Sequence, residues 1–233
     1  MLELIFLLSF SMTAILYIFI ESVKAQDIKI NNSFILNITK LSTFIKAIPT
    51  GLTTIFVFLM RPSDSPFYFI LTIGFLFCMV GDIGMEKGLV QGLIFFLFAQ
   101  IFFSVAFIYQ SIKFDITIDS LVIPILVAVG MISYTLLLMR YLESSEARLG
   151  KFKAPGITYF IFIGLMLVSA VLLWTTSKKL EFGIVIIGGL LFIISDSTIA
   201  VNQFHHNISY REIKVMSTYY AAILLISFAV LII

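Results

Sequence analysis

Two carboxylates lie inside segments that are otherwise apolar. Asp82 falls within the apolar run 67–85, and Asp196 falls within the apolar run 182–204. A carboxylate near the centre of a bilayer costs roughly 2.5 to 3.5 kcal/mol on insertion scales, so an intramembrane aspartate is a functional candidate by default. The two aspartates are therefore the first candidates for chemistry in this chain.

A pair of carboxyl groups in an apolar setting is suited to acid-base catalysis. Poor hydration favours the protonated form, and a second carboxylate nearby favours it further, because both groups cannot ionise cheaply. One member then donates a proton as general acid, while the ionised member orients or deprotonates water. The alternative is structural: each aspartate accepts hydrogen bonds from neighbouring hydroxyl groups and fixes the packing.

Further polar residues on neighbouring apolar segments are expected to bind substrate beside the aspartates. Tyrosines near helix ends also serve as interfacial anchors, and a lysine four residues into a span either extends to the headgroups or meets a phosphate. Two of the residues are seven positions apart, which is two helical turns, so they share a face. The set is Lys46, Gln91, Gln100, Ser195, Asn202, Tyr219 and Tyr220.

The composition is that of an integral membrane protein. The chain is 61% hydrophobic and 12% charged, with a mean hydropathy of +1.12, whereas soluble domains are roughly 45 to 50% apolar. The net charge is +2 and the basic residues are scattered, so no nucleic-acid surface is predicted. Cys78 is the only cysteine, which excludes a disulfide within the chain.

Apolar stretches long enough to cross roughly 30 Å of hydrocarbon as helices recur along the chain. The connections between them are too short for a soluble domain. The pattern predicts an all-α, polytopic protein with one transmembrane domain over 1–233 and about eight spans. These spans are 2–20, 44–60, 67–85, 89–112, 119–139, 155–175, 182–204 and 213–233. The first span has an alternative, a cleaved signal peptide, because Val23-Lys24-Ala25 resembles a cleavage site.

An internal echo relates the two aspartates. Segment 74–82 aligns without gaps with segment 188–196, and each ends in a small residue followed by aspartate. The segments belong to the third and seventh spans, which run in the same direction. If the halves are related by a parallel four-helix repeat, the carboxylates come to similar depth. The alternative is a chance similarity between two apolar helices.

The basic residues predict the orientation. Ten lysines and arginines lie in the odd-numbered connections and four in the even-numbered ones. By the positive-inside rule, the odd connections face the cytoplasm and both termini lie on the other side. The glycosylation sequons at Asn31, Asn37 and Asn207 are then cytoplasmic and unmodified. The organelle and a homo-oligomeric state stay open.

Familiar motifs of other enzyme classes are missing from the sequence. There is no Walker A loop, G-x-S-x-G elbow, HExxH helix or dinucleotide fingerprint. Nucleophilic serine catalysis therefore has no support, and no metal site is predicted.

Several ordered motifs carry a family resemblance. They are 46–49 (Lys-Ala-Ile-Pro), 81–82 (Gly-Asp), 191–196 (Leu-Phe-Ile-Ile-Ser-Asp) and 216–222 (Met-Ser-Thr-Tyr-Tyr-Ala-Ala). The chain resembles the lysoplasmalogenase (YhhN-like) family of integral membrane proteins over about positions 46–228. Relatives often have histidine where this chain has Gln91 and Gln100, and glutamine cannot titrate.

The resemblance implies a function. The family is expected to have eight spans and to hydrolyse the vinyl ether bond of lysoplasmalogens without a cofactor, giving a fatty aldehyde and glycerophosphocholine or glycerophosphoethanolamine. Asp82 and Asp196 match its essential aspartates, and the partners implied are a lysophospholipid substrate and the bilayer. Two alternatives remain: a proton- or cation-coupled transporter that uses the intramembrane aspartates, and a non-catalytic paralogue.

Overall fold

The computed structural model describes residues 1–25, 42–62, 65–144 and 149–233 of the chain. Every regular element in these ranges is helical. The α-helices are α1 (Leu2–Ala25), α3 (Ser42–Leu59), α4 (Pro66–Lys87), α5 (Leu89–Lys113), α6 (Ile118–Glu143), α7 (Lys153–Ser177), α8 (Gly183–Phe204), α9 (Arg211–Ser227) and α10 (Ala229–Ile232), with 3-10 turns at Gly150–Phe152 and Leu180–Phe182. The all-α prediction is confirmed, whereas the sequons at Asn31 and Asn37 lie outside the described residues.

Seven of the described helical segments are long and apolar enough to cross a membrane, and α3 is a shorter apolar helix. The 18 residues of α3 extend about 27 Å, slightly less than the roughly 30 Å of a hydrocarbon core. The predicted polytopic membrane protein is therefore confirmed. The second predicted span, 44–60, corresponds to α3, which ends at Leu59, just before Arg61 and Pro62.

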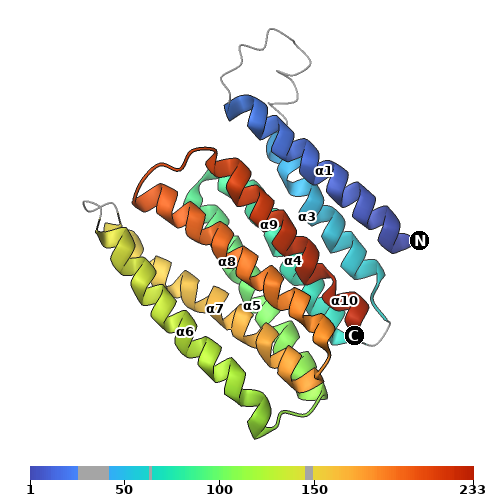
Figure 1. The fold of residues 1–233 in the computed structure, drawn as a ribbon. Coiled ribbons are helices and arrows are strands. Elements are labelled where there is room, and N and C mark those ends of the chain that lie inside the picture. The colour runs from blue at the N-terminus through green and yellow to red at the C-terminus, as the bar shows by residue number, and fades with distance from the viewer. Residues whose placement is uncertain (26–41, 63–64, 145–148) are drawn as a thin grey trace.

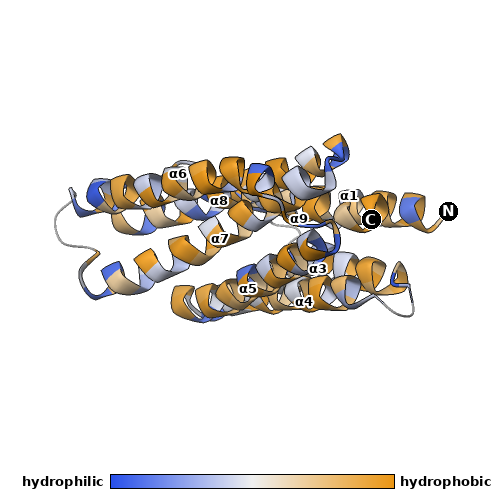
Figure 2. Cartoon of the chain, turned by 90° about the horizontal axis from the view of Figure 1, so that it is seen from below, coloured by the Kyte–Doolittle hydropathy of each residue, from blue (hydrophilic) through white to orange (hydrophobic). Residues whose placement is uncertain are grey.

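The helices form two layers. Figure 2 shows α6, α8, α9 and α1 on one side and α5, α4 and α3 on the other, with orange, apolar residues over most of the ribbon. Helix α7 packs beside α5 and also contacts α6 and α8. The two termini lie toward the same end of the bundle (Figure 1).

The first half of the chain contains α1, α3, α4 and α5, and the second contains α6, α7, α8 and α9. In each half the third helix packs along the fourth: α4 on α5 and α8 on α9. The aligned glycines of the echo lie at these two interfaces. A Cβ at Gly74 would lie 2.5 Å from the Phe103 ring of α5, and a Cβ at Gly188 would lie 2.9 Å from the Ile226 side chain of α9. Glycine is thus required at both positions for close helix approach. The repeat itself stays a prediction.

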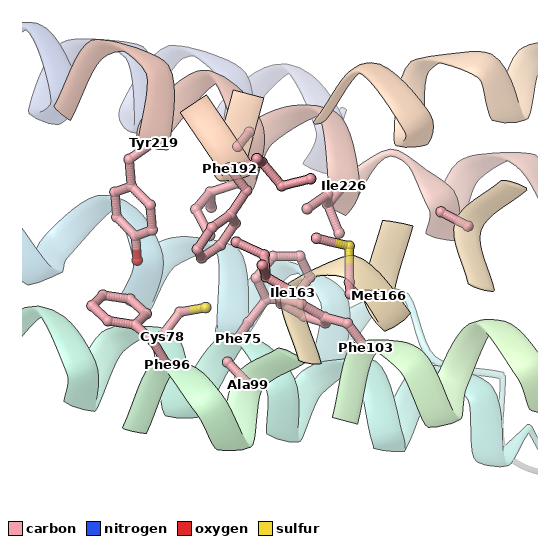
Figure 3. Packing of buried hydrophobic residues seen from close by; sticks show 14 of the residues in the cluster. Phe75, Cys78, Phe96, Ala99, Phe103, Ile163, Met166, Phe192, Tyr219 and Ile226 are labelled. Carbon is pink, nitrogen blue, oxygen red and sulfur yellow. The ribbon is translucent and has the colours of Figure 1, made fainter. Parts of the chain in front are cut away.

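Aromatic side chains fill the space between the layers (Figure 3). The rings of Phe75 and Phe103 are 4.9 Å apart, and Phe96 meets Phe192 edge-on at 6.1 Å. Tyr219 of α9 lies edge-on to both Phe96 and Phe192. This packing fixes where the Tyr219 hydroxyl lies, and the hydroxyl reaches the first aspartate.

Candidate active site

A cavity of about 180 Å³ lies between α3, α4, α5, α8 and α9, and both aspartates line it. Asp82 comes from the last turns of α4 and Asp196 from α8, while Lys46 lies near the start of α3 and Tyr219 in α9. A polar cavity of this volume has room for several water molecules. The structure thus brings together two carboxylates that are 114 positions apart in the chain.

Asp82 is held by two hydroxyl groups in a fully enclosed position. Its carboxylate is 1% exposed. Thr50 donates a hydrogen bond to Oδ2 at 2.5 Å and the Tyr219 hydroxyl donates to the same oxygen at 3.2 Å. A buried carboxylate needs such donors because it has left its water shell. Two helices, α3 and α9, therefore position the Asp82 side chain.

Asp196 has a partner of its own. The hydroxyl of Tyr159, from α7, donates a hydrogen bond to Asp196 Oδ2, and both residues are buried. The preceding residue, Ser195, donates from its hydroxyl to the Val215 carbonyl at 3.1 Å, which ties α8 to α9 at this level. Asp196 is thus fixed by a different set of helices from Asp82.

A cluster of alternating charges forms one end of the cavity. Lys46 Nζ donates to Oε1 of Glu212 at 2.8 Å and to Oε1 of Glu86 at 3.2 Å. Arg211 donates to the other Glu212 oxygen at 2.8 Å. Lys46 is only 6% exposed, and a buried ammonium group requires partners of this kind. Two cations and two carboxylates make the cluster formally neutral.

Tyrosines from two helices support this cluster from behind. The Tyr17 hydroxyl of α1 donates to Glu212 Oε1 at 3.1 Å, and the Tyr220 hydroxyl donates to the Lys46 carbonyl at 2.8 Å. Their rings meet edge-on at 6.2 Å. Helix α1 therefore takes part in building the ionic end of the site.

Three predicted substrate-binding residues line the cavity with the aspartates: Lys46, Ser195 and Tyr219. Tyr220 lies behind Lys46. The remaining three lie elsewhere in the described structure, and none of them lines the aspartate cavity.

Gln91, Gln100 and Asn202 occupy different surroundings. Gln91 is exposed and Gln100 is fully buried. They lie nine residues apart, two and a half helical turns, so they point to opposite sides of α5. Neither amide atom of Gln100 has a hydrogen-bond partner among the described residues. Asn202 lies near the end of α8, where its Oδ1 accepts the backbone N–H of Ile208 at 2.9 Å.

Several residues of the site were not predicted from the sequence. Some are charged residues near helix ends, where charges are usually solvated, and others carry only a hydroxyl group. The cavity wall includes Glu86, Glu212 and Arg211, which read in the sequence as solvated flanks of spans. Thr50 and Tyr159 give no sequence signal of their aspartate contacts. Glu86 had one usable signal, since it lies four residues after Asp82 and so shares its helix face.

The arrangement combines two buried carboxylates with a neutral ionic cluster in one hollow. Such carboxylates can transfer protons to and from a bound molecule or water. Among the described residues, no three His, Cys, Asp or Glu side chains converge as a metal ion would require. The carboxyl groups that line the cavity are Asp82 and Asp196, with Glu86 and Glu212 at the ionic end.

The fold and the cavity together define a multi-pass helical membrane protein with paired carboxylates in its core. The chain belongs to the YhhN family, whose sequence profile matches residues 41–230. This confirms the resemblance drawn from the motifs.

Two relatives carry the same descriptive name. The chain is 29% identical over 206 residues to the Homo sapiens protein named Lysoplasmalogenase TMEM86A, which covers 80% of this chain and 76% of that protein. It is 47% identical over 64 residues to the Bos taurus protein of that name, covering 28% of this chain and 24% of the bovine protein. No solved structure matches the chain.

Proposed function

We propose that this protein hydrolyses the vinyl ether bond of lysoplasmalogens to a fatty aldehyde and glycerophosphocholine or glycerophosphoethanolamine. The observation that carries the proposal is the common cavity, because Asp82 and Asp196 line it from separate helices. Membership of the YhhN family and the lysoplasmalogenase names of the relatives support the same activity.

The two carboxyl groups suit the two proton transfers of this reaction. A protonated carboxyl group adds its proton to the second carbon of the double bond, and an oxocarbenium ion forms at the carbon bonded to oxygen. Water adds to that carbon and gives its proton to the ionised carboxylate. The first carboxylate then takes the hydroxyl proton of the resulting hemiacetal, while the second carboxyl group gives its proton to the glycerol oxygen as the bond between that oxygen and the carbon breaks. An aldehyde and a glycerol hydroxyl group result, and both carboxyl groups return to their starting forms.

The charged surroundings suit the intermediate. A carboxylate close to the oxocarbenium ion stabilises its positive charge, and this effect is larger in a site from which bulk water is excluded. Asp82 and Asp196 are 1% and 6% exposed. At the ionic end, Lys46 and Arg211 offer donors to a phosphate, and Glu86 offers an acceptor to an ammonium group.

The direct test measures aldehyde release by the purified protein. Wild-type protein should release aldehyde from a lysoplasmalogen and none from the corresponding ester-linked lysophospholipid. Asp82→Asn and Asp196→Asn keep side-chain shape and remove the titrating group, so each should abolish release. Asp115→Asn is the matched control, because Asp115 is exposed and lies in the connection after α5.

Two results would contradict the assignment. Full activity in both cavity variants would remove the aspartates from the chemistry, provided that all variants elute as single species in detergent. No aldehyde from the wild type, combined with uptake driven by a pH gradient in vesicles, would replace the hydrolase with the transporter. Absence of both activities would indicate the non-catalytic paralogue.

A further inference from the structure

A second hollow lies on the outer side of Asp196, between α5 and α7. This groove has a volume of about 430 Å³, and its walls include Leu93, Leu97 and Pro155. Nearly all of its wall is apolar, and Val90 and Ile94 on the same stretch of α5 are exposed. In a membrane, such a surface faces the hydrocarbon.

A small cavity of about 40 Å³ lies between this groove and the aspartate cavity. It shares Asp196 and Ile199 with the aspartate cavity. It also shares Leu93, Gly156 and Tyr159 with the groove. The three hollows therefore follow one another in the order ionic cluster, aspartates, apolar groove.

We propose that the α5–α7 groove binds the hydrocarbon chain of a single-chain lysolipid whose vinyl ether lies at the aspartates and whose headgroup lies toward Lys46 and Arg211. The inference rests on the proposed function, because it names where the rest of that substrate lies. The sequence of surfaces matches the substrate from end to end: charged, then polar and reactive, then apolar.

Because the three hollows follow one another, the occupant of the groove is the hydrocarbon chain of the substrate itself. A second apolar hollow of about 210 Å³ lies between α6 and α7, lined by Met131, Ile161 and Leu165 among others, and it shares only Phe160 with the small cavity. Apolar surface alone therefore does not distinguish the α5–α7 groove. Its distinction is that it shares five wall residues with the small cavity, and one of them, Tyr159, donates a hydrogen bond to Asp196.

The groove should act mainly by orientation. Lipid tails are as apolar as leucine side chains, so moving a chain from the bilayer into the groove gains little from the hydrophobic effect. A chain held there nevertheless fixes the position of the double bond relative to Asp196, and such positioning contributes to rate. The groove should thus influence which chain lengths react well.

Gly156 is the position for the test, since it lines both the small cavity and the groove. A Cβ added there would meet only Met139, at 3.7 Å, which is ordinary contact. Gly156→Phe should therefore fold and place a ring in the path of the chain. We expect kcat/KM for a long-chain lysoplasmalogen to fall about tenfold relative to a short-chain one. Ile161→Phe, on the same helix but facing the α6–α7 hollow, should leave that ratio unchanged.

A binding measurement separates this inference from the proposed function. Wild-type protein is irradiated with a lysolipid whose chain is a saturated ether, which lacks the reactive double bond, and carries a diazirine at its far end. We expect labelling within 89–97 of α5 and within 152–158, which comprise the end of the preceding 3-10 turn and the first turns of α7. Excess unlabelled lysolipid should prevent this labelling. Labelling spread over the exposed face of α6, or equal loss of short- and long-chain activity in Gly156→Phe, would overturn the inference even with aldehyde release intact.

Discussion

The hydroxyl of Thr50 should be a positioning group for Asp82, and its removal tests the site without touching the cavity wall. Thr50 is fully buried and donates at 2.5 Å to Asp82, and it is not one of the residues that line the cavity. Thr50→Val replaces the hydroxyl by a methyl group of similar size, so the packing is nearly preserved. Thr50→Ser keeps the hydroxyl and serves as the control.

The expected magnitude follows from the charge of the acceptor. A hydrogen bond to a charged group contributes about 1.5 to 3 kcal/mol, and about 1.4 kcal/mol corresponds to a tenfold change in rate. Thr50 stabilises the carboxylate form of Asp82, which is the product of proton donation and the reactant of proton abstraction. If Asp82 is the proton donor, loss of the bond therefore slows the reaction by about 10- to 150-fold. If Asp82 is the proton acceptor, destabilising its carboxylate does not by itself slow proton abstraction.

The assay is steady-state aldehyde release from a lysoplasmalogen, with kcat and KM determined separately. With Asp82 as the proton donor, Thr50→Val should lower kcat and leave KM near that of the wild type, because the hydroxyl acts through Asp82 and does not line the binding space. Thr50→Ser should stay within a few-fold of the wild type. A kcat for Thr50→Val close to the wild-type value, or an equal loss in both variants, would refute the role of Asp82 as a proton donor positioned by Thr50.

Three further predictions concern stability and topology. Lys46→Met should destabilise the protein by about 1 to 3 kcal/mol. This loss is smaller than the loss expected on breaking a fully buried ion pair, because Glu212 remains 20% exposed. An unchanged thermal transition in detergent would contradict this prediction. Gln100→Met should raise that transition by about 1 to 3 kcal/mol of stability, because it removes a buried amide that has no hydrogen-bond partner in the described parts of the chain. A lower transition would indicate a hidden partner. Cysteine at Lys87 should react with an impermeant reagent only from the cytoplasmic side, and cysteine at Lys113 only from the opposite side; the reverse pattern would invert the predicted orientation.

Hydropathy predicts the helices of this fold closely because a bilayer leaves few alternatives. A backbone in hydrocarbon must satisfy its own hydrogen bonds, so an apolar run of about 20 residues has to be a helix. The predicted span 89–112 corresponds to α5 (Leu89–Lys113), and 182–204 corresponds to α8 with its preceding turn. Asp82 and Asp196 line a common cavity, whereas the repeat that would relate them, and their catalytic roles, stay predictions.

The rest of the site depends on how helices pack, which periodicity does not report. Glu86 and Glu212 were not expected at the site because charged residues at helix ends are usually solvated. They line a cavity here because α4 ends where α3 and α9 begin, so Lys46 meets both carboxylates. Gln91 and Gln100 show a different case: both residue types suggested a site, yet their spacing of nine residues places them on opposite sides of α5, which helical periodicity alone predicts.

The charged residues of the ionic cluster show how deep the cavity lies along the helices. Lys46 lies near the start of α3, Glu86 near the end of α4, and Glu212 near the start of α9, so the ionic cluster lies near one end of the bundle. Both aspartates lie further from the helix ends, Asp82 one turn deeper than Glu86. A polar headgroup can then remain near the membrane surface while the bond to be cleaved reaches the aspartates. For a single-chain lipid bound as proposed, this arrangement would bring the vinyl ether to the two aspartates without moving the charged headgroup into the hydrocarbon, which would be costly.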